Sequence, residues 1–312
     1  MKKNVYLLLI VLLAIINISG CIEFTNSKTI YVGEDAEYIT IQNAIDNASD
    51  GDTVFVNKGI YYEFLYINKS INLVGENKEN TIIKYQDFGK FYSTNMIFVD
   101  KNGCTIKGFK IIGKGLNSDC IGIHVNSSKV NISSNIIIEN YIGINFSENT
   151  FNNKAFKNTM LENLYGIALR QSDNNNVSNN NISSSTFYGI YIYLAEGNYI
   201  FENFLSDNWY GIKVKGSERN LIFNNLIYNN DIGIETCCGS GYNIIYSNIF
   251  ENNSNHANDT LFNQWDNGII GNYWDDYIGD DKDDDGIGDT PYEITDSNNF
   301  DRFPLTNKGK FI

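Results

Sequence analysis

The sequence predicts an all-β protein, a single-stranded right-handed parallel β-helix with a short N-terminal capping helix and an irregular C-terminal cap. Three observations predict it: a fixed repeat, a two-residue apolar alternation inside each repeat, and no ten-residue helical pattern between repeats. Gly-Ile pairs mark the repeat, at spacings of 21, 23, 23, 22 and 22 residues, and begin at Gly122, Gly143, Gly166, Gly189, Gly211 and Gly233. A period in this range is typical of a solenoid.

The residues around each glycine alternate as they do in a strand with one buried face. Around Gly189, the positions one before, one after and three after hold the apolar residues Tyr188, Ile190 and Ile192, whereas the position two after varies between repeats. A second apolar alternation precedes each glycine. We therefore expect two or three short strands per turn, each pairing with its counterpart one turn along.

A column of asparagines keeps the same period. It lies eight residues before each glycine from the second onward, and its expected members are Asn135, Asn158, Asn181, Asn203, Asn225 and Asn248. Asparagine tolerates the left-handed backbone of a sharp turn, and its amide can bond the asparagine one turn away, about 4.7–4.8 Å along the stack. We expect an inward structural ladder of these amides, and only a backbone role for the glycines.

Length and composition fit one elongated domain, because each turn of a solenoid buries itself against its neighbours. We expect a signal peptide over residues 1–20, a tether over 21–29, an N-terminal cap over 30–52, the β-helix over 53–255 and a C-terminal cap over 256–312. The net charge of −14 and the sequence pI near 4.5 argue against nucleic acid or an anionic membrane surface as the main partner.

The first residues are expected to form an export signal. Lys2 and Lys3 precede an apolar run from Val5 to Ile16, which is too short to span a bilayer as a stable helix. The following Ile18-Ser19-Gly20-Cys21 resembles a lipobox, which implies cleavage before Cys21, lipid attachment to its sulfur, and a location on the outer face of the cell membrane. The alternative is an ordinary signal peptide and secretion.

A short amphipathic helix is expected at the start of the solenoid. Ile41, Ala44, Ile45 and Ala48 have helical spacing, so the helix begins after Thr40 and ends before the turn at residues 50–52. Such a helix covers the open strand edge of a β-helix. The sequence of residues 30–84 resembles the N-terminal region of pectin-lyase-like β-helices. This resemblance implies the fold and no activity.

An acidic loop follows the repeats. Asp281, Asp283, Asp285, Gly286 and Asp289 stand at positions one, three, five, six and nine of a calcium loop. Carboxylates at alternate positions converge on one hard cation when such a loop curls, so calcium is the expected cofactor. Position twelve is Tyr292, which departs from the helix-loop-helix pattern. A solvated acidic turn is the alternative.

This tail and the repeats together resemble the NosD-like family of extracytoplasmic β-helix proteins. The resemblance rests on G-N-Y-W at Gly271–Trp274 and D-G-x-G-D-T-P-Y at Asp285–Tyr292. It implies the β-helix fold and, from the best-known member, copper-site maturation of nitrous oxide reductase. The chain holds two histidines, His124 and His256, and two methionines beyond the first, which are not clustered with them in the sequence. These residues argue against copper as a cofactor.

One expected strand face carries a candidate binding site. The outward positions two and four after each glycine are Asn145, Ser147, Ala168, Arg170, Tyr191, Tyr193, Lys213, Lys215, Glu235 and Cys237. In so acidic a chain, three cations beside two tyrosines are unusual. Tyrosine rings stack on sugars and cations favour uronate or sulfate groups, so the predicted ligand-binding residues are Arg170, Tyr191, Tyr193, Lys213 and Lys215. A solvated strand surface is the alternative.

The sequence therefore favours a membrane-anchored extracytoplasmic protein that binds an anionic polysaccharide or serves the cell envelope, without catalytic residues. A polysaccharide lyase or glycoside hydrolase is the first alternative, although Glu235 is the one acidic residue on the face described above. A NosD-like copper-site maturation factor is the second. The cysteines after Cys21 are expected to be structural thiols.

Overall fold

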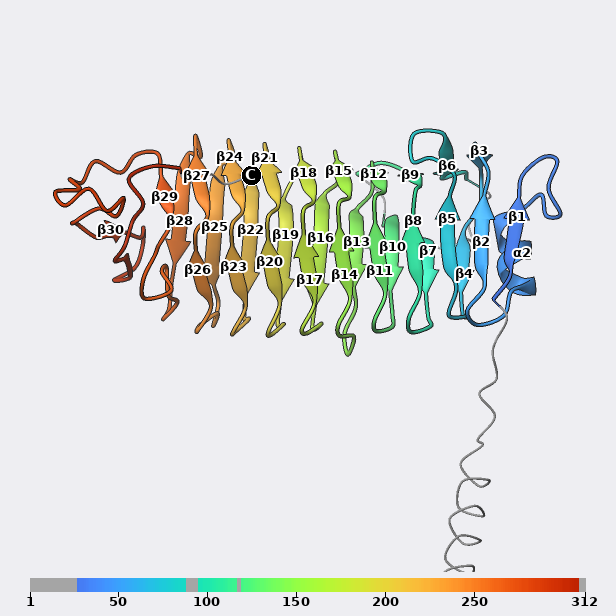
Figure 1. The fold of residues 1–312 in the computed structure, drawn as a ribbon, viewed down its shortest axis with the longest axis horizontal. Coiled ribbons are helices and arrows are strands. Elements are labelled where there is room, and N and C mark those ends of the chain that lie inside the picture. Colours follow the sequence, from blue (N-terminus) through green and yellow to red (C-terminus); the bar gives the residue numbers. More distant parts are fainter. Residues whose placement is uncertain (1–26, 88–94, 117–118, 309–312) are drawn as a thin grey trace, which may run out of the picture.

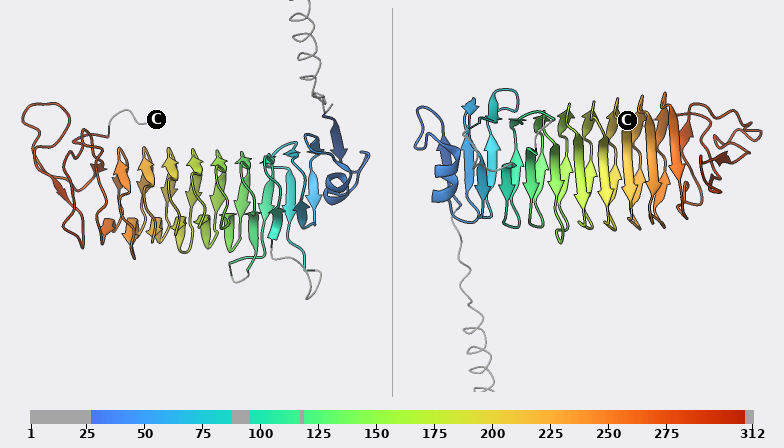
Figure 2. Two further views of the ribbon diagram at one scale, coloured as in Figure 1. Left: turned by 90° about the horizontal axis from the view of Figure 1, so that it is seen from below. Right: turned by 180° about the vertical axis from the view of Figure 1, so that it is seen from behind.

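The computed structural model describes residues 27–87, 95–116 and 119–308. The expected signal peptide and Cys21 lie outside these residues. The chain winds into one elongated parallel β-helix of three strands per turn, with the short helix at one end and irregular loops at the other (Figures 1 and 2). The predicted fold class is therefore confirmed.

Three parallel sheets run along the solenoid, and the described residues contribute ten, nine and ten strands to them. Sheet A contains β1 Thr29–Val32, β2 Thr53–Val56, β5 Asn72–Gly75, β8 Thr105–Lys107, β11 Asn131–Ser133, β14 Lys154–Phe156, β17 Asn176–Ser178, β20 Tyr199–Phe201, β23 Leu221–Phe223 and β26 Ile244–Tyr246. Sheet C contains β4 Leu65–Ile67, β7 Asn95–Val99, β10 Ile121–Val125, β13 Ile142–Phe146, β16 Tyr165–Arg170, β19 Tyr188–Tyr193, β22 Tyr210–Lys215, β25 Ile232–Cys237 and β28 Asn255–Asp259.

Sheet B lies between them in each turn. It contains β3 Gly59–Tyr61, β6 Thr81–Lys84, β9 Lys110–Ile112, β12 Ile136–Ile138, β15 Thr159–Leu161, β18 Asn181–Ser183, β21 Phe204–Ser206, β24 Leu226–Tyr228, β27 Ile249–Glu251 and β29 Tyr273–Trp274. The strands are too short to fold alone, so each turn depends on the stack for its stability.

The core is a set of apolar columns, one turn above another. Sheet A places Val177, Ile200 and Ile222 in one such column, and all three side chains are fully buried. Burying one aliphatic side chain of this size contributes roughly 1.5–3 kcal/mol. The glycine column lies in sheet C, where a Cβ on Gly166 would approach the carbonyl oxygen of Gly189 to 2.5 Å. Close backbone approach therefore explains the glycines, as expected.

The predicted asparagine ladder exists, with one member misplaced. Asn203 Oδ1 accepts hydrogen bonds from both the backbone N–H and Nδ2 of Asn180 at 3.0 Å, and its own Nδ2 donates to Asn225 Oδ1. The member between Asn158 and Asn203 is Asn180, whereas Asn181 is exposed at the start of β18. The prediction of Asn181 was wrong because this turn carries one extra residue, near Thr186, between its asparagine and Gly189.

Two further ladders escaped sequence reasoning. The B-to-C corner stacks five asparagines around one serine, and the C-to-A corner stacks six asparagines without interruption. Their members are Asn140, Asn163, Ser185, Asn208, Asn230 and Asn253 at the first corner, and Asn153, Asn175, Asn198, Asn220, Asn243 and Asn263 at the second. Each of the three corners therefore has its own amide stack in the turns that follow Asn135, Asn140 and Asn153.

The left-handed residue at each corner is the neighbour of the ladder asparagine. Lys157, Asn179 and Glu202 have φ of 54–56° and directly precede Asn158, Asn180 and Asn203. The turn thus requires the positive φ one residue earlier than expected. The ladder asparagine supplies only its amide, which satisfies backbone N–H and C=O groups that the turn leaves without strand partners.

The predicted helix is confirmed as α2, Ile41–Asn47, with Ile41, Ala44 and Ile45 buried. It packs against the first strands at the N-terminal end of the solenoid (Figure 1). Glu63, which sequence reasoning missed, accepts the backbone N–H of Ile41 and of Gln42 at 2.9 Å. A carboxylate at this position satisfies two of the free N–H groups and favours the positive end of the helix dipole.

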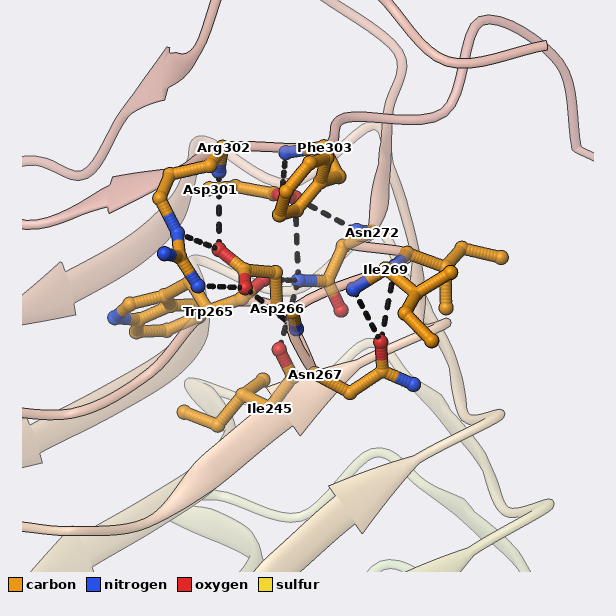
Figure 3. Close-up of polar contacts among 11 residues, drawn as sticks. Ile245, Trp265, Asp266, Asn267, Ile269, Asn272, Asp301, Arg302 and Phe303 are labelled. Carbon is orange, nitrogen blue, oxygen red and sulfur yellow. Dashed lines mark hydrogen bonds and ion pairs between the residues drawn. The ribbon is translucent and has the colours of Figure 1, made fainter. Parts of the chain in front are cut away.

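The described part of the C-terminal cap, residues 256–308, closes the other end. It contains the antiparallel pair β30 Tyr292–Glu293 and β31 Phe300–Asp301, and its indoles Trp265 and Trp274 are fully buried. Figure 3 shows its polar centre, where Asp301 Oδ2 accepts the backbone N–H of Asn272 at 2.6 Å. The same oxygen accepts the indole N–H of Trp274 at 2.9 Å. Asp266, beside it, pairs with Arg302.

Candidate functional site

The strand register gathers the predicted ligand-binding residues on the outer face of sheet C. Tyr191 lies beside Lys213, and Tyr193 lies between Arg170 and Lys215 in the next column. Glu235 and Cys237 continue the two columns on β25. Residues 22 or 23 positions apart in the sequence therefore become neighbours on one surface, because the turns stack in register.

A cluster of tyrosines that the sequence did not reveal enlarges this surface. The ring centroids of Tyr165 and Tyr188 are 5.1 Å apart, those of Tyr188 and Tyr191 are 4.9 Å apart, and those of Tyr191 and Tyr193 are 5.8 Å apart. Tyr210 extends the cluster from Tyr188 at 5.3 Å. Burial is the main cause that raises the pKa of Tyr191 to about 12, so this phenol remains neutral.

The position before each glycine was expected to be part of the buried apolar face, which is confirmed for Ile142 and wrong for the other five repeats. Tyr188 is half-buried and belongs to the outer cluster, whereas Gly189 and Ile190 are both buried. The alternation slips by one residue because the glycine backbone approaches the next turn closely. The signal that could have found the cluster is the repetition of tyrosine at 165, 188 and 210.

The three predicted cations differ in what they offer a ligand. Arg170 is exposed, and Lys215 is half-buried with its Nζ 5.8 Å from the ring centroid of Tyr193. Lys213, by contrast, is only 9% exposed and forms an ion pair with Glu235. Burial alone would lower the pKa of Lys213, but the bond to Glu235 raises it overall. The prediction of Lys213 as a cation available to a ligand was wrong, because its charge is paired with that of Glu235.

A second polar group lies at the N-terminal side of the same face. His124 Nε2 is 2.5 Å from Ser147 Oγ, and His124 Nδ1 is 3.0 Å from Asn95 Oδ1. Asn145 Nδ2 lies 3.3 Å from the same Ser147 oxygen. Burial, and then the charge of Arg170, lower the pKa of His124. Sequence reasoning missed this group because its members lie on three different turns.

The acidic loop assembles only in part as expected. Carboxylate oxygens of Asp281, Asp283 and Asp285 lie within 4.8 Å of one another, a spacing that suits a hard cation. Asp289 is not in this group, and its Oδ2 instead accepts the backbone N–H of Lys282 at 3.0 Å. Gly286 has the positive φ, 89°, that the loop pattern requires.

The side chains do not fit a copper site built from histidine and methionine. His124 and His256 stand six strands apart along sheet C, roughly 29 Å at about 4.8 Å per strand. His256 Nε2 is bonded to Asp275 at 2.7 Å, and Met96 and Met160 are fully buried in the core. Within the described residues, the thioether and imidazole groups therefore do not converge, and we assign no chemistry to copper.

The cysteines after Cys21 lie within the solenoid. Cys104, Cys120 and Cys237 are buried and Cys238 is exposed. Cys104 Sγ donates to the carbonyl oxygen of Lys101 at 3.0 Å, and burial raises its pKa to about 11. A thiol in this state is a poor nucleophile. No helix among the described residues is long and apolar enough to cross a bilayer.

Solved structures share the fold at low sequence identity. A DFA-IIIase from Arthrobacter chlorophenolicus A6 matches with a TM-score of 0.61 and 14% identity, over 80% of this chain and 76% of that one. An alginate lyase from Paenibacillus sp. str. FPU-7 matches with a TM-score of 0.54 and 16% identity, over 79% of this chain and 97% of that one. No curated protein matches. At such identities the likeness establishes the β-helix alone.

One protein-family model covers most of the chain. It is described as periplasmic copper-binding protein (NosD) and matches residues 45–279, from α2 through the solenoid into the C-terminal cap. The description as periplasmic agrees with an extracytoplasmic location. The chain therefore belongs to the NosD family of β-helix proteins.

Proposed function

We propose that this protein binds an anionic polysaccharide along the outer face of sheet C, outside the cytoplasm, and that a lipid on Cys21 holds it to the membrane. The observation that carries the proposal is the continuous surface formed by Tyr188, Tyr191 and Tyr193 beside the cations Arg170 and Lys215. We name this set the tyrosine face.

The tyrosine face has the two properties that an acidic sugar polymer requires. Half-buried tyrosine rings present flat apolar surface for pyranose rings, and their hydroxyls can donate hydrogen bonds to sugar oxygens. The guanidinium of Arg170 can grip a carboxylate with two parallel hydrogen bonds, and Lys215 adds a second positive charge two strands away. The net charge of the chain is −14, so two nearby cations with no carboxylate partner among the described residues mark this face as a place where an anion can bind.

The geometry also favours a long ligand over a compact one. Successive strands of a sheet lie about 4.7–4.9 Å apart, so side chains of one column recur at that interval along the solenoid. A polymer laid along the axis therefore meets one outward side chain of each column at every turn, and these include Arg170, Tyr193 and Lys215 in one column. The protein similar to this one that is named an alginate lyase supports a uronate polymer as the first probe.

Retention on a polyuronate column or gel tests the proposal. We expect the mature protein to be retained and the double variant Arg170→Ala/Lys215→Ala to lose roughly tenfold or more in affinity, because both charge contacts are removed. Retention of the wild type should fall as salt rises, since screening weakens the charge contacts.

A matched control removes two cations from another face. Lys107 and Lys154 are exposed on sheet A, so Lys107→Ala/Lys154→Ala changes the net charge by the same amount and should leave retention unchanged. Equal loss in both double variants would mean that the net charge, and not the tyrosine face, governs retention. No retention of the wild type on any polyuronate would contradict the proposal.

A further inference from the structure

We propose that Ser147 and His124, oriented by Asn95, hydrolyse O-acyl esters carried by the glycan on the same face. The substrate class rests on the proposed function, whereas the catalytic group rests on its own geometry. This inference departs from the expectation of a protein without catalytic residues.

The three side chains have the connectivity of a nucleophile, a base and a positioning residue. Asn95 begins β7, His124 lies on β10 and Ser147 directly follows β13, so three adjacent turns contribute one residue each. His124 Nε2 contacts Ser147 Oγ at 2.5 Å, and His124 Nδ1 contacts Asn95 Oδ1 at 3.0 Å. These distances meet the geometric requirement for an activated hydroxyl.

The hydrogen-bond network selects the tautomer that such a mechanism needs. Asn95 Oδ1 can only accept, so Nδ1 of His124 carries the proton and Nε2 is left with its lone pair toward the Ser147 hydroxyl. Burial and the Arg170 charge lower the pKa of His124, which keeps the imidazole neutral and able to accept a proton. The arrangement is that of a hydrolase triad with asparagine as the third member.

Two groups able to stabilise negative charge lie beside the nucleophile. Asn145, which is 5% exposed, places Nδ2 at 3.3 Å from Ser147 Oγ, and its buried Oδ1 has no partner in the described structure. Arg170 lies on the next strand, two residues beyond Ala168, the register partner of Asn145. An amide N–H and a guanidinium beside the nucleophile suit the oxyanion of a tetrahedral intermediate.

The reaction balances with water as the only co-reactant. Ser147 Oγ attacks the ester carbonyl carbon while its proton passes to His124 Nε2. The intermediate collapses, the bond from the carbonyl carbon to the sugar oxygen breaks, and that oxygen leaves with the proton from Nε2. Water then attacks the acyl-serine, gives one proton to Nε2, and releases the carboxylic acid as Ser147 regains its hydrogen.

The surroundings place a polymer across the nucleophile. The tyrosine face begins on the C-terminal side of Ser147, and a recess of about 370 Å³ lies on the N-terminal side, lined by Phe64, Leu65, Tyr66, Asn95 and Phe98. The Phe98 ring is in edge contact with His124, with centroids 5.0 Å apart. A glycan bound along sheet C therefore passes over the hydroxyl of Ser147.

Covalent labelling tests the nucleophile directly. The mature protein is treated with a fluorophosphonate and digested, and the modified peptide is identified by mass spectrometry. We expect modification of Ser147, and hydrolysis of 4-methylumbelliferyl acetate that falls roughly a thousandfold or more in Ser147→Ala and in His124→Ala. Ser183→Ala, which removes a half-exposed serine from sheet B, should leave both readouts unchanged.

Asn95 and the substrate class have separate readouts. Asn95→Ala should lower kcat with KM nearly unchanged, and Asn95→Asp should restore part of it, because a positioning residue acts through His124. Acetate release from O-acetylated polygalacturonate should occur with the wild type and stop in Ser147→Ala, which keeps its retention on polyuronate.

Three outcomes would overturn the inference. Labelling at a residue other than Ser147, or ester hydrolysis that persists in Ser147→Ala, would refute the catalytic assignment even if the glycan is bound. Hydrolysis of the small ester without acetate release from the polymer would refute the glycan as substrate. Retention on polyuronate without esterase activity would refute the esterase but not the proposed function, whereas esterase activity without retention would refute the proposed function alone.

Discussion

The middle turns and the C-terminal cap of this molecule are stabilised in opposite ways. From Asn135 to Asn248 the corners are held by neutral amides that repeat from turn to turn. The cap instead depends on three buried carboxylates that each occur once, Asp259, Asp266 and Asp301 (Figure 3 shows the last two). The same amide hydrogen bonds can be repeated in any number of turns. At the end of the solenoid, by contrast, the cap must provide partners for buried polar groups that occur only once.

The difference decides where function can lie. Because inward amides and apolar columns hold the middle turns, most of their outward side chains have no structural duty, and Arg170 and Lys215 are available to a ligand. In the cap the charged side chains are themselves structural, as Asp266 with Arg302 illustrates. Changes of pH or of single residues should therefore affect the two regions differently.

Removal of Asp301 should give the largest loss of stability. Its carboxylate accepts the N–H groups of Asn272, Trp274 and Phe303, so Asp301→Ala leaves buried donors without a partner at a cost of about 4 kcal/mol. Fluorescence of the cap indoles Trp265 and Trp274, in a Trp209→Phe background, measures this unfolding. Asp301→Asn keeps an acceptor and should lose less, and a loss below about 1 kcal/mol in Asp301→Ala would contradict the role given to the carboxylate.

Removal of one ladder amide from the middle should cost less, about 2–3 kcal/mol. Asn203→Ala removes the acceptor of two Asn180 hydrogen bonds and the donor to the Val177 carbonyl, all of them buried. The matched control is Asn181→Ala, an exposed asparagine that lies next to a ladder member and should change stability by no more than about 0.5 kcal/mol. Chemical denaturation followed by circular dichroism compares the two, and equal losses would refute the assignment of Asn180 to the ladder.

Mild acid should stabilise the cap and not the middle. Burial raises the pKa of Asp301 from its ordinary 3.8 to about 6, so between these values the folded state binds a proton that the unfolded state lacks. Stability contributed by this group therefore rises as the pH falls from 7 to 5, by about 1–2 kcal/mol. Burial alone would raise the pKa of Asp266, but the bonds to Arg302 lower that pKa overall. The stability that the Asp266 carboxylate contributes is therefore lost only as the pH falls below the ordinary range of an aspartate.

The comparison of wild type with Asp301→Asn isolates this effect. Indole fluorescence during thermal unfolding at pH 7 and pH 5 should show a gain in the wild type that is smaller in Asp301→Asn. The same gain in both proteins would assign the pH dependence to other carboxylates.

Calcium should have the smallest effect, also confined to the cap. The expectation that Asp281, Asp283 and Asp285 hold calcium stays a prediction, and at ten times the dissociation constant binding adds about 1.4 kcal/mol. Calorimetry with calcium, magnesium and chelator should show a shift of the cap transition for calcium that Asp283→Asn abolishes. Asp289→Asn should preserve the shift, because Asp289 lies outside the cluster.

The sequence predicts the fold well because every turn of a solenoid repeats the same pattern of residues. The glycine column that includes Gly189 and the asparagine column that includes Asn203 recur at nearly constant spacing, and Ile41, Ala44 and Ile45 have the spacing that α2 requires. The period fails where a turn changes length, as between Asn180 and Gly189. It also concealed two amide ladders, because their asparagines fall at other positions within the same repeat.

The candidate site was harder to predict, since it depends on contacts across turns. Alternation places Arg170 and Tyr191 outward, but it does not tell that Glu235 reaches Lys213 one strand away. Nor does spacing reveal His124 between Asn95 and Ser147, because 29 and 23 residues separate them in the sequence. Residues so far apart in the sequence can be recognised as neighbours only when the number of residues in every turn is known, because that number sets the strand register.

The most direct test measures stability and polyuronate retention together in an inward and an outward variant of the middle turns. We predict that Asn203→Ala lowers the free energy of unfolding but is retained on polyuronate as the wild type is. Arg170→Ala/Lys215→Ala should unfold as the wild type does but should no longer be retained. Loss of both properties in each variant would contradict the separation of inward structural residues from outward binding residues.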